Sequence, residues 1–132
     1  MRYSKKKKKE IKIKHCLKIK QSLNNIFITF CTIEGLVLFK LSKGLTELKF
    51  NKKRSIFLFE LIMKVFLKKC LRKVKRIRRH PILVQAMVPL SSAYMLKGCL
   101  RAIKSRKIRI HYFYFFNKKG FNGLRKKKQR RK

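Results

Sequence analysis

Residues 82–116 read ILVQAMVPLSSAYMLKGCLRAIKSRKIRIHYFYFF, and this stretch decides the fold class. It opens with a short apolar run, 82–88, and closes with 108–116, which is rich in the β-branched and aromatic residues typical of strands. Between them, 93–105 has the helical spacing of apolar and cationic residues that predicts an amphipathic helix. The stretch therefore predicts a strand–helix–strand unit of an α/β sheet.

The expected helix has a start signal and two distinct faces. Ser91 and Ser92 precede it and are candidate N-caps. Its amino-terminal end can present backbone N–H groups to a phosphate. Its apolar face comprises Leu96, Cys99, Leu100 and Ile103, and its cationic face comprises Lys97, Arg101 and Lys104.

Upstream, the pattern is first strand-like. Residues 25–33, NIFITFCTI, are apolar on both faces and predict a strand that is covered on both sides. A turn at Glu34-Gly35 leads into LVLFKLS, residues 36–42, which predicts the second strand of a hairpin. Residues 42–55 are polar and basic and predict a loop that faces phosphate.

Residues 56–71 then predict a buried helix that Ser55 caps. Glu60, Lys64 and Lys68 recur every four residues and form its polar stripe. The resulting order, β-β-α-β-α-β, predicts an α/β fold with a mixed sheet and two helices. We expect a basic arm over 1–20, a body over 21–117 and a basic tail over 118–132.

Charge indicates the partner. The 132 residues hold 40 Lys and Arg against 4 Asp and Glu, a formal net charge of +36 that repels itself in a compact monomer. A polyanion cancels this repulsion, and nucleic acid has the charge density that fits best. An anionic membrane surface is the physical alternative. With 45% hydrophobic residues and 11 Phe, the chain is too apolar for a disordered basic tail.

Cysteine and glutamate, which often bind metals or take part in catalysis, are scattered along this sequence. Four cysteines lie far apart without a C-x-x-C pair, so we expect buried free thiols and no metal site, although four could also form disulfides. Four glutamates form no acid/base motif, and no nucleotide-binding signature is present, so we expect no enzyme and no cofactor. The longest apolar run is too short to cross a membrane.

Four short segments resemble the bacterial-type small-subunit ribosomal protein family eleven, especially its mitochondrial members. They occur in the family's order and together cover about residues 20 to 132. They are Leu23-Asn24-Asn25 with Ile28-Thr29, Gly35, Val37 and Leu38; Ser42 and Gly44 before a basic loop; Gly98-Cys99-Leu100-Arg101-Ala102-Ile103; and Asn122-Gly123 with Arg125 and the basic end.

The chain also departs from that family. Residues 89–97, PLSSAYMLK, replace a glycine-rich loop and contain no Gly. Phe121 and Leu124 replace a His and a Cys of the family's tail, and Lys126-Lys127 replace its two prolines. The divergence, and a Lys-, Ile-, Phe- and Asn-rich composition typical of AT-rich genomes, favour a mitochondrial and possibly organelle-encoded form.

The resemblance implies a structural protein of the small-subunit platform, near the messenger exit and the exit-site tRNA. Its partners would be small-subunit rRNA, neighbouring platform proteins and possibly mRNA, with no membrane and no homo-oligomer. The rival interpretations are a free nucleic-acid-binding protein and a cationic membrane-surface protein. The expected RNA-binding residues are Asn24, Asn25, Lys49, Lys52, Lys53, Arg54, Arg101, Asn122, Gly123, Arg125, Lys126, Lys127, Lys128, Arg130, Arg131 and Lys132.

Two further segments have open interpretations. The six basic residues between Arg72 and Arg79 favour RNA contact over a solvated helix exit. The aromatic run 112–116 either stacks on bases, as in single-strand binders, or forms a core strand, and we expect the core strand.

Overall fold

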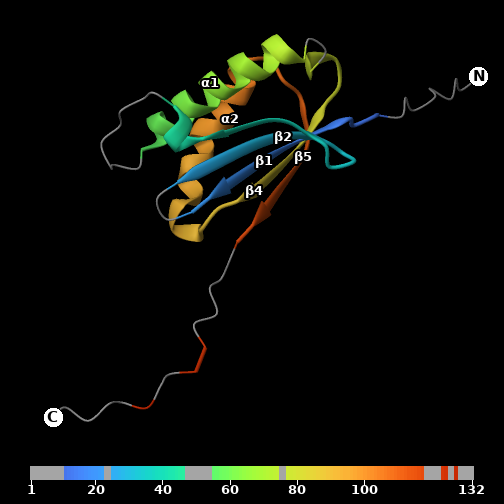
Figure 1. Ribbon diagram of the computed structural model, residues 1–132. Coiled ribbons are helices and arrows are strands. Elements are labelled where there is room, and N and C mark those ends of the chain that lie inside the picture. Colours follow the sequence, from blue (N-terminus) through green and yellow to red (C-terminus); the bar gives the residue numbers. More distant parts are fainter. Residues whose placement is uncertain are drawn as a thin grey trace, which may run out of the picture.

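The computed structural model describes residues 11–22, 25–46, 55–74, 77–117, 123–124 and 127. Within them, five strands form one mixed sheet, and two α-helices lie on the same side of it (Figure 1). The expected α/β class is confirmed. The elements are β1 (His15–Gln21), β2 (Ile26–Thr32), β3 (Val37–Ser42), α1 (Ile56–Lys73), β4 (Ile82–Met87), α2 (Leu96–Ser105) and β5 (Ile110–Phe116), with 3-10 turns at Lys43–Leu45, Ile77–Arg79 and Leu90–Met95.

The strand order across the sheet is β3-β2-β1-β4-β5. Strands β1 and β2 pair antiparallel, as do β2 and β3, whereas β1, β4 and β5 run parallel to one another. The amino ends of the three parallel strands therefore lie at the same end of the sheet. Strand β1 is the central strand, and β3 and β5 are the two edges.

Strand β1 corrects the expected boundary of the basic arm, because it begins at His15, within the stretch 1–20. Leu17 and Ile19 are almost fully buried, while Lys18 and Lys20, which alternate with them, are exposed. This alternation is the period of a half-buried strand. The high density of lysines obscured it in the sequence. Residues 1–10 of the expected arm lie outside the described residues.

Helix α1 forms as expected and runs two residues further. The Ser55 side-chain oxygen accepts a hydrogen bond from the Leu58 N–H at 3.1 Å, so the predicted N-cap is confirmed. On the polar stripe, Lys64 Nζ lies 2.7 Å from Glu60 Oε1. Substituting such an N-cap typically costs about 1 kcal/mol, whereas an exposed i,i+4 ion pair contributes less than about 0.5 kcal/mol. The cap is the stronger local signal.

Helix α2 begins later than expected. Residues 90–95 form a 3-10 turn, the helix starts at Leu96, and Ser91 and Ser92 do not cap it. Its faces agree with the prediction in most positions: Leu96, Cys99 and Ile103 are buried, and the cationic side chains are exposed.

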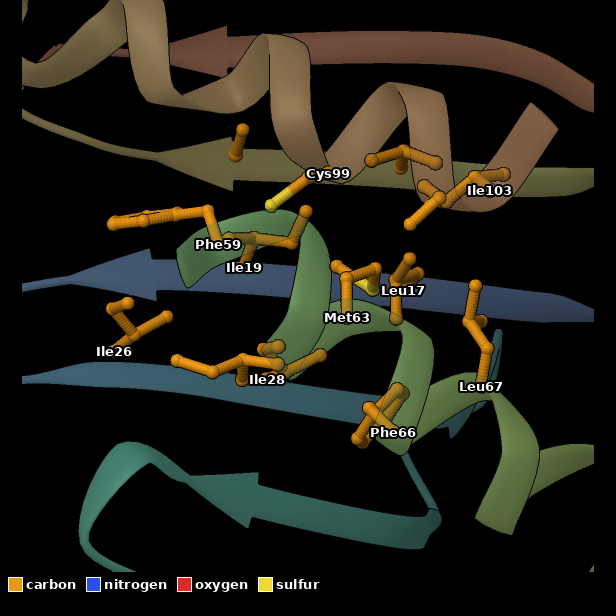
Figure 2. Packing of buried hydrophobic residues seen from close by; sticks show 14 of the residues in the cluster. Leu17, Ile19, Ile26, Ile28, Phe59, Met63, Phe66, Leu67, Cys99 and Ile103 are labelled. Carbon is orange, nitrogen blue, oxygen red and sulfur yellow. The ribbon is translucent and has the colours of Figure 1, made fainter. Parts of the chain in front are cut away.

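The core lies between the helices and one face of the sheet. Figure 2 shows Leu17 and Ile19 of β1 and Ile28 of β2 in the same cluster of buried side chains as Met63 and Phe66 of α1. Each side chain of this size contributes about 1.5–3 kcal/mol when fully buried. Packing of one sheet face is therefore the main stabilising contribution.

The other face of the sheet corrects two expectations. Strand β2 is not covered on both sides, because Phe27 is 41% exposed. Strand β5 is not a core strand, because every residue from Tyr112 to Phe116 is exposed. Both expectations assumed that apolar side chains would be covered. Strand β5 instead is an outermost strand of the sheet. Both helices lie on the same side of the sheet, so they do not cover its other face.

Candidate nucleic-acid interface

A cationic cavity lies at the amino ends of the parallel strands. It has a volume of about 440 Å³ and is formed by the segments that lead into β1, β4 and β5. Because these strands are parallel, segments that are far apart in the sequence meet at the end of the sheet where the strands begin. The lining residues are Ile11, Lys12, Arg79, His80, Pro81, Arg109, Ile110 and His111.

Hydrogen bonding orients one of the arginines of this cavity. The Arg109 guanidinium donates from Nη2 to the Arg79 carbonyl oxygen at 3.0 Å, which ties the segment before β5 to the segment before β4. A guanidinium has five N–H donors, so this bond leaves most of its donors for another acceptor. Among the described residues that line the cavity, none carries a carboxylate.

The charge around the cavity also acts on a neighbouring histidine. The imidazole of His15, the first residue of β1, stacks on the Phe30 ring at a centroid distance of 5.1 Å. Burial lowers the pKa of His15, and the nearby charges of His80 and Lys14 lower it further. A positive charge is thus disfavoured at His15 in the free protein. Burial is the larger cause of this shift, and the positive charges near His15 are the smaller one.

The chemistry of this arrangement suits phosphate. Arginine and histidine side chains can donate hydrogen bonds to phosphate oxygens, and Lys12 adds a point charge. Lys12, Arg109 and His111 were not among the residues predicted from the sequence to bind RNA. Local pattern offered no signal for them, because only strand order brings residues 12, 79–80 and 109–111 together.

Among the residues expected to bind RNA, Asn25 has a clear structural role. Its side-chain oxygen accepts from the Ile26 N–H at 2.8 Å, and its own N–H donates to Ser22 Oγ at 3.1 Å. It shapes the turn between β1 and β2, which is the ordinary role of Asn in turns. Contact of Asn25 with RNA stays a prediction.

Three other expected residues are described. Arg101 is exposed on the outer face of α2. Gly123 has φ +68°, a left-handed conformation that favours glycine. Lys127 is exposed. The described residues do not bring Asn25 and Arg101 into one site with the cavity.

The remaining expected RNA-binding residues lie outside the described residues. They include most of the basic loop before α1 and most of the tail. They are Asn24, Lys49, Lys52, Lys53, Arg54, Asn122, Arg125, Lys126, Lys128, Arg130, Arg131 and Lys132.

The four cysteines are buried free thiols, as expected. Burial raises the pKa of Cys16 to about 11 and the pKa values of Cys70 and Cys99 to about 12. Such thiols are poor nucleophiles near neutral pH. Among the described residues, no group of three or more His, Cys, Asp or Glu is placed to hold a metal ion.

No helix within the described segments has the length and apolar character needed to cross a membrane. No protein-family model matches this chain, and no curated protein matches its sequence significantly.

Proposed function

We propose that this protein is a structural constituent of the small ribosomal subunit that binds small-subunit rRNA and supports mitochondrial translation. In this proposal, the α/β body docks on folded rRNA at the platform, near the messenger exit and the exit-site tRNA. The basic ends of the chain neutralise the phosphate charge between rRNA helices. No catalytic step and no cofactor are part of it.

The observation that carries the RNA-binding part is the uncompensated positive charge of the described body. Its only two carboxylates are Glu34, in the hairpin turn, and Glu60, which already pairs with Lys64. The cavity at the amino ends of β1, β4 and β5 is lined by several cationic side chains, and its described lining residues include no carboxylate. A phosphate backbone supplies the missing counter-charge, and release of its condensed counterions adds affinity.

The ribosomal and mitochondrial parts rest on the four segments that resemble family eleven. One of them contains a residue for which the described backbone has a specific need. Gly35 has φ +100° in the β2–β3 hairpin, a conformation that favours glycine. This need supports the placement of that segment at a hairpin turn, as the resemblance implies.

Sedimentation of the tagged full chain in a mitochondrial lysate, on a high-salt gradient, tests the proposal. We expect the protein to sediment with small subunits and to be released by ribonuclease. Sedimentation as free protein, with small subunits intact, would reject the ribosomal assignment in favour of a free nucleic-acid-binding protein. Flotation with vesicles, insensitive to ribonuclease, would favour the membrane-surface alternative.

A further inference from the structure

The face of the sheet opposite the helices carries aromatic and cationic side chains in register across the strands. Neighbouring residues in paired strands share a face. One row therefore runs from Thr29 through Lys18 and Gln85 to Tyr114, and the next runs from Phe27 through Lys20 and Met87 to Phe116. Lys40 of β3 extends the first row. We call this surface the open face.

The aromatic residues of the open face form a ladder along edge strand β5. Tyr112, Tyr114 and Phe116 are alternate residues on it, 51%, 46% and 48% exposed. Successive ring centroids lie 6.1 Å and 6.5 Å apart. Three large aromatic rings in a row, each about half exposed, are unusual on the surface of a monomeric protein. They indicate a surface that is covered when the protein is in its working state.

The cations of the open face indicate what covers it. Lys18 and Lys20 project from central strand β1, two strands from the aromatic ladder, and both are exposed. Neither described carboxylate lies on this face. Neighbouring strands are about 4.8 Å apart, so the lysines lie roughly 10 Å from the rings. A single strand of RNA that is stacked on the rings can therefore place backbone phosphates near the lysines.

We propose that the open face binds single-stranded RNA, with bases stacked on Tyr112, Tyr114 and Phe116 and with phosphates bound by Lys18 and Lys20. Sheets with exposed aromatic rings are a common way to bind unpaired RNA, because every base has a flat face that can stack. The inference deepens the proposed function, since it presumes an RNA-bound protein. It names both the surface and the kind of RNA.

Two features favour unpaired RNA over other partners. A duplex hides the faces of its bases, so it would leave the aromatic ladder unused. The cores of protein–protein interfaces are depleted in lysine, whereas two lysines stand near the middle of this face. The cationic cavity also adjoins the ladder, because His111 lines the cavity and its ring lies 4.2 Å from the Tyr112 ring. A strand of RNA can thus continue from the ladder into the cavity.

The first test compares two exposed tyrosines. Tyr114 on the ladder and Tyr94 in the turn before α2 are 46% and 47% exposed. With the full chain and an unstructured oligouridine at raised salt, we expect Tyr114→Leu to weaken binding about tenfold, and Tyr94→Leu to leave it unchanged. Tyr114→Phe keeps the ring and should keep the affinity. Binding to a blunt RNA duplex should be equal for all four proteins.

The second test separates stacking from charge. Lys20→Gln should reduce the slope of log affinity against log salt by about 0.7, the value for one phosphate of a single strand, whereas Tyr114→Leu should leave the slope unchanged. The chain contains 4 Tyr and no Trp, so tyrosine emission is directly visible. Stacked bases should quench it in the natural protein, and much less in a Tyr112→Phe, Tyr114→Phe double variant that still binds.

The outcomes distinguish this inference from the proposed function. If the natural protein binds no RNA, the proposed function itself is wrong. If it binds RNA but Tyr114→Leu and Tyr94→Leu behave alike, the open face is not the site and the inference alone is overturned. If the free chain instead dimerises and Phe116→Lys restores a monomer, the ladder is a protein interface, which also overturns it.

Discussion

Gly98 on α2 lies directly against the main chain of Ile56 in the first turn of α1. A β-carbon on Gly98 would overlap the Ile56 carbonyl oxygen and would lie 3.1 Å from the main-chain nitrogen of Glu60. The two helices therefore approach each other closely at this point, near the end of α1 that Ser55 caps. Glycine is required here for packing between helices, although it is a poor helix former.

We expect Gly98→Ala to destabilise the protein. Overpacking typically costs about 1–3 kcal/mol, which exceeds the gain of about 1 kcal/mol that alanine brings in helix propensity. Urea denaturation of the full chain measures the change. Gly44→Ala is the matched control, because a β-carbon there has no atom within 4 Å. Equal stability of the Gly98→Ala and natural proteins would mean that the helices are further apart.

The stability of the protein should fall below about pH 6.5 because of His15. Its pKa is lowered in the folded protein by burial and then by His80 and Lys14, so the unfolded chain binds a proton that the folded chain excludes. The contribution is complete above the unfolded pKa and is lost as pH falls through the interval down to the folded pKa. His15→Phe preserves the stack on Phe30 and removes the titration.

Melting temperatures at pH 7.5 and 5.5 measure this effect. The natural protein should lose more on acidification than His15→Phe, and His111→Phe serves as a control that leaves His15 in place. An identical loss in the natural and His15→Phe proteins would show that His15 does not contribute.

The buried thiols should resist alkylation in the native state. The pKa of Cys99 is raised by burial from an ordinary value of 9.0 to about 12, which lowers its thiolate fraction at pH 8 by about 1000-fold. Mass spectrometry after iodoacetamide treatment should find Cys70 and Cys99 modified only slowly in the native chain, and rapidly in urea. Rapid modification without denaturant would contradict the buried positions.

The cationic cavity should contribute to RNA affinity through charge. Arg109→Gln should weaken binding and should reduce the salt slope by about 0.7 to 0.9, the value for one phosphate. Lys69→Gln, on the exposed side of α1, removes the same charge and should change the slope less. Arg109→Lys keeps the positive charge and removes the guanidinium that donates to the Arg79 carbonyl oxygen. We expect this variant to keep the salt dependence of RNA binding of the natural protein. Equal slopes for Arg109→Gln and Lys69→Gln would argue against a phosphate in the cavity.

Local elements of this protein could be predicted from the sequence because their signals are local. The cap at Ser55 and the spacing of Glu60 and Lys64 predicted α1, and the apolar face of α2 was predicted in most of its positions. A helix shows its buried face within a few turns of chain. The same reasoning missed β1, because the lysines of HCLKIKQ suggested a solvated arm where the alternation indicated a strand.

By itself, the sequence determined that the chain packs an α/β core and carries a large net positive charge, since apolar period and net charge depend only on the residues present. The order of strands depends on pairing between distant segments, which no local pattern specifies. Only the tertiary structure placed β1 at the centre and β5 at an edge with its aromatic rings exposed. It alone joined residues 12, 79–80 and 109–111 in one cationic cavity, because parallel strands begin at the same edge of the sheet.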